Sequence, residues 1–343
     1  MELAVSAFAV FVFCAIIGSF LNVVIYRVPA GESVISPGSH CPECGTPIRW
    51  YDNIPIASWM ILGGKCRACG SSISVRYPLI EALTGMLGAM LWIKLASKPL
   101  SEDVPFTSLS PTGLFVIFGL YFTFIVLCII IAFIDLDTVE IPFRFSLAGV
   151  LLGVASPFLV TQYITDPRLY LIEGGHWPPV LPTHSVIGAL LGAGAVLALI
   201  IIYYAARGVP GMGGGDVPLM AMVGAWLGWP AILFVFFASS IQALLATGLI
   251  YTFGDGEDFF FDANELFEDD DEHTEAERDD EEHSHAAAHD LDEVDAPAAE
   301  EDDEGGLIAI PYGPFITLAA VEHLLFGDLL PSSISLAYLY TLL

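Results

Sequence analysis

Long apolar runs constrain this chain more than any other feature of its sequence. A run of about 18 or more apolar residues can cross the hydrocarbon of a bilayer as one helix. Of the 343 residues, 55% are hydrophobic, and the mean hydropathy of +0.69 excludes a soluble globular domain. We expect eight membrane helices, at 4–26, 79–97, 113–134, 145–162, 184–205, 215–228, 230–252 and 313–330. The predicted fold class is therefore an all-α polytopic membrane protein.

Most of the acidic residues lie in one segment. Residues 254–304 hold 25 of the 40 acidic residues and one of the 11 basic ones, Arg278, so they carry −24 of the net charge of −29. Few apolar residues and dense like charge are typical of disordered chain. The sequence predicts a nearly neutral membrane body that carries one acidic insert.

The basic residues predict an orientation, because lysine and arginine gather on the cytoplasmic side of a membrane. With eight spans, most of them fall on one side, and only Lys98 and Arg168 fall clearly on the other. We therefore expect that first side to face the cytoplasm and both termini to face outward. Arg27 follows the first apolar run instead of preceding it, so the run does not resemble a cleavable signal peptide.

Four of the six cysteines form two Cys-x-x-Cys pairs between the first two runs. The pairs are Cys41 with Cys44 and Cys66 with Cys69, and 21 residues separate them. Each pair brings two thiolates onto one turn, and two such turns supply the four sulfur ligands that Zn²⁺ prefers. Free thiols or two disulfides are the alternatives, and a cytoplasmic location argues against disulfides. We expect a structural Zn²⁺ site, because four cysteines leave no position for a catalytic water.

The remaining features of these cysteines are local. Gly45 and Gly70 directly follow the two pairs, where a turn often requires a positive φ. Cys14 and Cys128 lie inside apolar runs, so we expect them to be small packing residues.

Two aspartates lie where a membrane-length apolar run meets a polar loop. Asp135 ends the run 122–134, and Asp216 follows Gly213, Gly214 and Gly215. A carboxylate at the edge of hydrocarbon is costly to keep charged, so by default it marks a functional site. Two such groups close together share one proton and act as general base and general acid on a water molecule. This is the chemistry of an aspartic protease.

Other carboxylates and other roles compete with this interpretation. Asp137 would point about 200° away from Asp135 on a helix, so we expect it to be a solvated residue at the helix end, and Glu140 is also nearby. Asp216 also suits a helix N-cap, a role that is compatible with catalysis. The three glycines before it would let an extended substrate backbone approach, or would form only a flexible turn.

A series of motifs follows in a fixed order along the chain. They are Gly18–Arg27, the two Cys-x-x-Cys pairs with Arg49–Pro55 between them, Arg76–Glu81, Ile134–Asp137, Gly213–Asp216 and Ile310–Pro314. Together they resemble the prepilin leader peptidases, also called type IV prepilin peptidases/N-methyltransferases, which are GxGD aspartic peptidases of the membrane. The chain departs from the family at Phe143, where members often have aspartate, and at Pro218, where they often have lysine. Neither position is a proposed catalytic carboxylate.

The resemblance implies an endopeptidase of the bacterial cytoplasmic membrane with its active site facing the cytoplasm. It would cleave the short basic leader of type IV pilin or type II secretion pseudopilin precursors, with Asp135 and Asp216 as the catalytic pair. Many members then methylate the new N-terminus with S-adenosylmethionine, whose binding residues the sequence does not identify. The implied partners are these precursors and the lipid bilayer, with no nucleic acid, and the oligomeric state is not predicted.

The resemblance also implies how the chain is divided. We expect a first membrane helix (1–26), a zinc-binding domain (27–78), a peptidase core with both aspartates (79–253), the acidic insert (254–306) and a last membrane helix with the C-terminus (307–343).

Two polar residues inside the apolar runs have two interpretations. Asn22 and Glu81 lie near the predicted cytoplasmic ends of the first two spans. We expect them to form structural hydrogen bonds between helices. Contact with the substrate or with the methyl donor is the alternative.

Two other classes of function remain open at this point. The acidic insert contains His273, His283, His285 and His289. Such a tract would suit loose binding of divalent cations, as in a cation transporter with Asp135 and Asp216 as ion ligands. Against it, the two aspartates lie at the membrane edge and not midway across, where transporter sites usually lie. An inactive scaffold of a secretion or pilus assembly is the third hypothesis.

Overall fold

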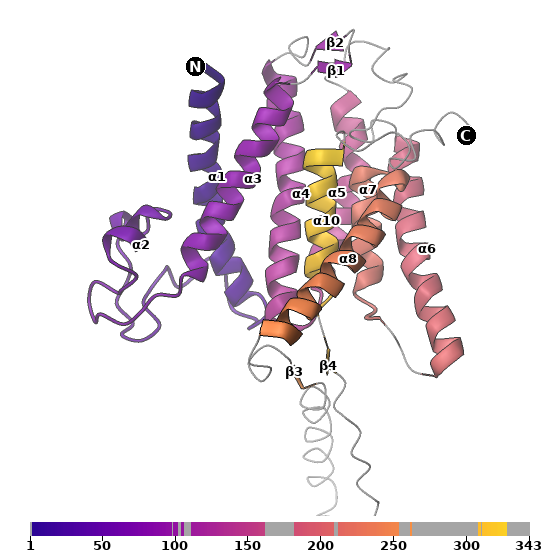
Figure 1. The fold of residues 1–343 in the computed structure, drawn as a ribbon. Helices are drawn as coiled ribbons and strands as arrows, with labels where there is room; N and C mark the ends of the chain where they lie inside the picture. The colour runs from indigo at the N-terminus through magenta and orange to yellow at the C-terminus, as the bar shows by residue number, and fades with distance from the viewer. Residues whose placement is uncertain are drawn as a thin grey trace, which may run out of the picture. The chain divides into compact units, whose positions relative to one another are not determined.

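The computed structural model describes residues 2–97, 99–101, 104–105, 111–161, 182–208, 212–253, 261–262, 308–309 and 311–327. Eight apolar helices dominate these residues (Figure 1). They are α1 (Glu2–Arg27), α3 (Arg76–Ser97), α4 (Pro111–Thr138), α5 (Phe143–Thr161), α6 (Pro182–Arg207), α7 (Asp216–Leu227), α8 (Trp229–Phe253) and α10 (Gly313–Phe326). The cysteine segment between α1 and α3 adds the short helices η1 (Trp50–Asp52) and α2 (Ala57–Ile61). The all-α prediction is confirmed.

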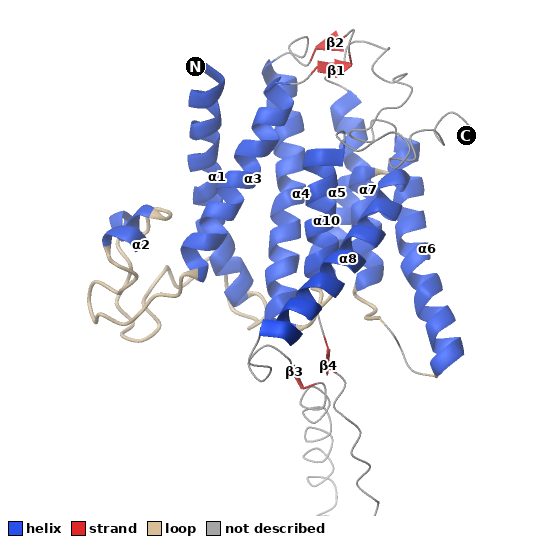
Figure 2. Ribbon diagram, viewed as in Figure 1, coloured by secondary structure: helices blue, strands red, loops and turns tan. Residues whose placement is uncertain are grey.

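Strands make a minor contribution to the described part of the chain (Figure 2). β1 (Pro99–Ser101) pairs antiparallel with β2 (Val104–Pro105), and β3 (Phe261–Asp262) pairs antiparallel with β4 (Ile308–Ala309). The chain divides into two compact units, Met1–Leu244 with Pro311–Leu343, and Leu245–Ile310. The second unit contains β3 and β4, and the rest of the predicted acidic insert lies outside the described residues.

The predicted count of eight membrane helices is not shown by the described residues. Among the described residues, six helices are long and apolar enough to cross a membrane, and not eight. The exceptions are α7 with 12 residues and α10 with 14. At about 1.5 Å per residue they are roughly 18–21 Å long, shorter than the roughly 30 Å of hydrocarbon. The predicted segment for α7, 215–228, was already this short, whereas α10 ends four residues before the predicted 330.

The short helix α7 forms the centre of the core. Its residues from Leu219 to Leu227 are all buried. Gly188 on α6 and Gly224 on α7 face each other so closely that a Cβ on either residue would collide with the backbone carbonyl of the other. The Trp226 indole N–H donates to the Gly149 carbonyl of α5 at 2.8 Å. Such backbone-to-backbone packing is typical of helices in membranes, where small residues allow close approach. It fixes the helix whose first residue is Asp216.

Helices α1 and α3 also pack side by side (Figure 1). A Cβ at Gly18 of α1 would lie 2.9 Å from the Glu81 Cα of α3. Asn22 donates from its side-chain amide to the Tyr77 carbonyl at 3.2 Å. This contact agrees with the structural interpretation of Asn22.

Candidate active site and cysteine cluster

Asp135 lies near the C-terminal end of α4, three residues before the helix ends. Although the sequence places it next to a polar loop, its side chain is only 2% exposed. Its Oδ2 atom accepts a hydrogen bond of 2.9 Å from the backbone N–H of Gly313, the first residue of α10. A Cβ at position 313 would lie 2.5 Å from the same Oδ2 atom. Glycine at 313 therefore allows the backbone to reach the carboxyl group.

Asp216 is the first residue of α7 and is 4% exposed. The prediction that it serves as a helix N-cap is wrong, because Gly215 occupies the N-cap position and no side chain caps this end. Its Oδ1 atom is buried and has no hydrogen-bond partner among the residues that the structure describes. A buried carboxyl oxygen without a partner is costly, which is expected of a group that must bind a substrate or a water.

The two aspartates come from helices far apart in the sequence but are brought to one place. Ile141, in the turn after α4, lies against the glycine loop before Asp216 and against the start of α10, where Gly313 binds Asp135. A Cβ at Gly215 would lie 2.8 Å from the Ile141 Cβ, and one at Gly313 would lie 3.2 Å from the Ile141 Cδ1. The ends of α4 and α7 that carry the two buried aspartates therefore meet at Ile141.

Asp137 is engaged elsewhere. Arg76, the first residue of α3, donates to both of its carboxylate oxygens, at 2.7 and 2.6 Å. Both side chains are more than a third exposed. The Arg76 guanidinium also lies over the Phe133 ring, 5.2 Å from its centroid. Asp137 is thus at the helix end, as expected, but it forms an ion pair and is not simply solvated.

The three glycines before Asp216 differ in their surroundings. A Cβ at Gly214 would meet nothing within 4 Å, whereas one at Gly215 would collide with Ile141. At Gly213 the nearest atom would be the Asp216 Oδ2 at 3.7 Å. Gly215 is therefore required for packing, and the open space lies at Gly214. The approach of a substrate backbone to this loop stays a prediction.

Glu81 links α3 to the cysteine segment. It is 8% exposed, and its Oε2 atom accepts a 2.7 Å hydrogen bond from the Ile56 backbone N–H. Ile56 has a φ of 63°, a conformation that a β-branched residue rarely adopts. The hydrogen bond to the Glu81 carboxyl group helps to hold this strained residue. The contact agrees with the structural interpretation of Glu81.

The four cysteines predicted as zinc ligands come together. The Sγ atoms of Cys41, Cys44, Cys66 and Cys69 all lie within 4.8 Å of one another. The sulfurs of Cys41 and Cys69 are 3.8 Å apart, the separation expected around a tetrahedral Zn²⁺ with Zn–S bonds of about 2.3 Å. All four are free thiols, which does not support the disulfide alternative. This donor set fits a metal ion.

The two cysteine turns have the same backbone design. The Gly45 N–H donates to the Cys41 carbonyl and the Gly70 N–H donates to the Cys66 carbonyl, both at 2.9 Å. Gly45 has a φ of 66° and Gly70 a φ of 76°, so the prediction of positive φ at both glycines is confirmed. The backbone N–H of Cys44, followed by the hydroxyl of Ser71, lowers the pKa of the Cys41 thiol to about 6. A thiolate is the form that binds a metal.

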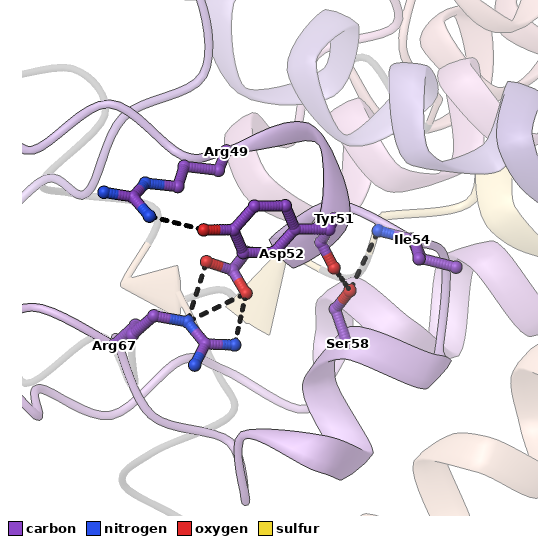
Figure 3. Close-up of polar contacts among 6 residues, drawn as sticks. All are labelled: Arg49, Tyr51, Asp52, Ile54, Ser58 and Arg67. Carbon is purple, nitrogen blue, oxygen red and sulfur yellow. Dashed lines mark hydrogen bonds and ion pairs between the residues drawn. The ribbon is translucent and has the colours of Figure 1, made fainter.

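The loop between the two turns is held by its own polar contacts (Figure 3). Arg67 donates to both carboxylate oxygens of Asp52, with distances of 2.6 to 3.0 Å. The Tyr51 ring lies 5.8 Å from the guanidinium carbons of both Arg49 and Arg67, and Arg49 donates to the Tyr51 hydroxyl. Ser58 then donates to the Tyr51 carbonyl at 3.0 Å. These contacts join the segment after the first turn to the second turn and to α2.

Sequence reasoning missed two contributors to the aspartate site. Gly313 belongs to the Ile310–Pro314 motif, which supported only a family resemblance, although a glycine between aromatic and proline residues indicates close backbone approach. Ile141 is an ordinary apolar residue, and nothing in its sequence context marks its position between the two loops.

Comparison with known proteins agrees with these features. Residues 12–95 match the bacterial peptidase A24 N-terminal domain, and residues 122–248 match the type IV leader peptidase family. These ranges contain the four cysteines and both aspartates, respectively. No solved structure gives a significant match.

Three relatives of this chain carry the name prepilin leader peptidase/N-methyltransferase. That of Myxococcus xanthus is 36% identical over 70% of this chain, and the match spans 64% of the relative's length. That of Neisseria gonorrhoeae is 33% identical over 67% of this chain and 77% of the relative. That of Aeromonas hydrophila is 32% identical over 70% of this chain and 80% of the relative. The chain is a multi-pass membrane protein that belongs to the type IV leader peptidase family.

Proposed function

We propose that this chain is a membrane aspartic endopeptidase that cleaves the basic leader of type IV prepilin-like precursors. The observation that carries this proposal is that Asp135 and Asp216 are both buried and that the ends of α4 and α7 meet beside Ile141. Membership of the leader peptidase family supplies the class of substrate. The ion pair in which Arg76 donates to both oxygens of Asp137 supports leaving Asp137 out of the catalytic pair.

The chemistry follows from two carboxyl groups in one buried site. Like charges at close range cannot both ionise, so one aspartate is ionised while the other holds a proton. The ionised group accepts a proton from the attacking water, and the protonated one polarises the scissile carbonyl and later protonates the leaving amine. No covalent intermediate is required. The pair titrates as a unit, so the two roles belong to Asp135 and Asp216 jointly.

We place the site at the cytoplasmic face of the bacterial inner membrane. The Arg76–Asp137 ion pair joins the start of α3 to the end of α4, so a basic residue lies at the membrane edge where α4 carries Asp135. Arg27 and Arg207 end α1 and α6, and Arg144 lies at the start of α5. In helices that alternate in direction, these positions share one side, and positive charge favours the cytoplasmic side.

The cysteine cluster is proposed to hold one structural Zn²⁺. Cys41, Cys44, Cys66 and Cys69 would be the four ligands, and the ion would tie the two turns together. Four thiolate ligands leave no open coordination position, so the ion takes no part in cleavage.

The second proposed activity is methylation of the new N-terminus with S-adenosylmethionine. The names of the relatives, which include N-methyltransferase, support it. Among the described residues, no cluster identifies a site for this methyl donor, and no step is assigned to it. Membership of the leader peptidase family argues against the cation-transporter hypothesis. The four histidines on which that hypothesis was based lie outside the described residues.

Mass spectrometry of a co-expressed precursor tests the proposed function. The precursor should carry a short basic leader followed by an apolar helix. We expect the wild-type chain to remove the leader at one site and to add the mass of a methyl group to the new N-terminus. An intact precursor in the presence of folded wild-type protein would contradict the peptidase assignment and favour the scaffold hypothesis. Cleavage without the added methyl group would contradict only the proposed N-methyltransferase activity.

A further inference from the structure

The loop before α10 is anchored to α8 by one side chain. The Tyr312 hydroxyl lies 2.8 Å from the Ser239 Oγ and 3.0 Å from the Ser240 Oγ. Ser239 is fully buried. Both serine hydroxyls also donate to the Phe236 carbonyl, at 3.1 and 2.8 Å. Their lone pairs are then available to the proton of the tyrosine, which becomes the donor.

The next residue after Tyr312 is the one that touches the aspartate pair. Gly313 donates its backbone N–H to the Asp135 Oδ2 at 2.9 Å, in a space too small for a Cβ. A single peptide unit therefore joins the tyrosine anchor to the hydrogen bond on the carboxylate. Because that unit is planar and rigid, a shift at Tyr312 moves the N–H of Gly313 directly.

The Tyr312 hydroxyl is not needed to bury the ring. The ring lies near Phe315, with centroids 6.5 Å apart, and is partly buried against the core. Phenylalanine would keep this apolar contact and lose only the bonds to the two serines. The hydroxyl therefore serves to fix the loop in one position.

We propose that Tyr312, held by Ser239 and Ser240, is a positioning residue that keeps the Gly313 N–H on the carboxylate of Asp135. The expected effect on the cleavage rate rests on the proposed peptidase function. The expected effect on the position of the Gly313 N–H does not depend on that function. The Gly313 N–H stabilises the carboxylate and fixes its rotamer, so that Asp135 faces its partner before the substrate arrives. The hydrogen bonds of the Tyr312 hydroxyl go to Ser239 and Ser240, so in this proposal Tyr312 acts on Asp135 through Gly313.

Kinetics with a precursor peptide test the effect on rate. Tyr312→Phe should lower kcat roughly two- to tenfold, as expected for one ordinary hydrogen bond, and leave KM unchanged. The double variant Ser239→Ala/Ser240→Ala should show a loss of similar size. Combining all three substitutions should add nothing further, because the same contact is removed each time. Ser240→Thr keeps the hydroxyl at an exposed position and should retain the wild-type kcat.

Tyr204→Phe is the matched control, because Tyr204 is an exposed tyrosine on α6. This substitution also removes a tyrosine hydroxyl, but from a residue on α6 that is far from Tyr312 in the sequence, so it should leave kcat unchanged. A wild-type kcat in Tyr312→Phe, or losses that add in the triple variant, would overturn the proposal.

Amide hydrogen exchange at Gly313 tests the structural part without any catalysis. In Tyr312→Phe the exchange should be faster than in the wild type and in Tyr204→Phe, because the bond to Asp135 opens more often. If the wild type cleaves no precursor, the proposed function fails while the exchange rate still decides the positioning role. Unchanged exchange in Tyr312→Phe would overturn the positioning role even in an active enzyme.

Discussion

Residues 41–73 form their turns through contacts between near neighbours, whereas Asp135 and Asp216 depend on contacts between segments far apart in the sequence. In the cysteine segment, each turn closes a hydrogen bond over four residues, as from Gly45 to Cys41. At the aspartate pair, Gly313 reaches Asp135 from 178 residues away. The structure of the first region is therefore determined mainly by local sequence, whereas the second region forms only when the helices pack.

The two regions also depend on different stabilising forces. The cysteine segment is small and exposes large apolar side chains such as Trp50 and Ile61, so it lacks a hydrophobic core of its own. A metal site commonly compensates for this deficit. The aspartate pair is held by close helix packing, in which Gly188 and Gly224 bring α6 and α7 into backbone contact. Substitutions in the two regions should therefore have different measurable effects on stability and metal content.

The largest effect on stability is expected from filling the contact between α6 and α7. Gly224→Ala places a Cβ against the Gly188 carbonyl, where only backbone lies and nothing can move aside. We expect a loss of about 3 kcal/mol or more in the free energy of unfolding, at the upper end of overpacking effects. Thermal unfolding in detergent measures it.

Gly194→Ala is the control for that change, because a Cβ at this α6 position meets nothing within 4 Å. It should be neutral or should stabilise the helix by about 0.5–1 kcal/mol. Equal losses in the two variants would mean that α6 and α7 do not pack as described.

A smaller, local effect is expected from removing one cysteine ligand. Cys66→Ser should reduce bound zinc from about one equivalent per chain to almost none. The cysteine segment should become sensitive to protease while the helices keep their melting temperature, because the packing around α7 is untouched. Elemental analysis and limited proteolysis report the two effects.

Cys128→Ala is the matched control, since Cys128 is buried in α4 and is not part of the cluster. It should retain the full zinc content. Wild-type protein that contains no zinc and still resists protease, with its cysteines reduced, would contradict the structural metal.

The smallest effect is expected where the two regions meet, at the ion pair between Arg76 and Asp137. Both side chains are more than a third exposed, and exposed ion pairs typically contribute only about 0.2–1 kcal/mol. Arg76→Gln should lower stability by no more than that amount and leave cleavage intact. A double-mutant cycle with Asp137→Asn measures the coupling. Complete loss of cleavage in Arg76→Gln would show that this pair belongs to the active site.

The same contrast explains how much the sequence could reveal. The four cysteines and the positive φ of Gly45 and Gly70 were predictable, because ligand spacing and turn chemistry are local properties. The boundaries of the apolar segments were also largely visible in composition. The pairing of Asp135 and Asp216 was proposed from their place at the membrane edge and from the family resemblance.

Other features required the packed structure. The N–H of Gly313 on Asp135 and the place of Ile141 between two loops arise from helix contacts. The ion pair from Arg76 to Asp137 likewise joins residues 61 positions apart. No local pattern encodes such pairs, so one sequence alone does not predict them.

Cleavage by three isosteric variants is the most direct test of the account. Asp135→Asn and Asp216→Asn keep the size of each side chain but remove the group that exchanges a proton, so each should lower kcat by at least about a hundredfold. Asp137→Asn removes the same charge from the ion pair with Arg76 and should retain most of the wild-type activity. All three variants must be recovered as inserted, zinc-loaded protein. An active Asp135→Asn together with an inactive Asp137→Asn would contradict the assignment of the catalytic pair.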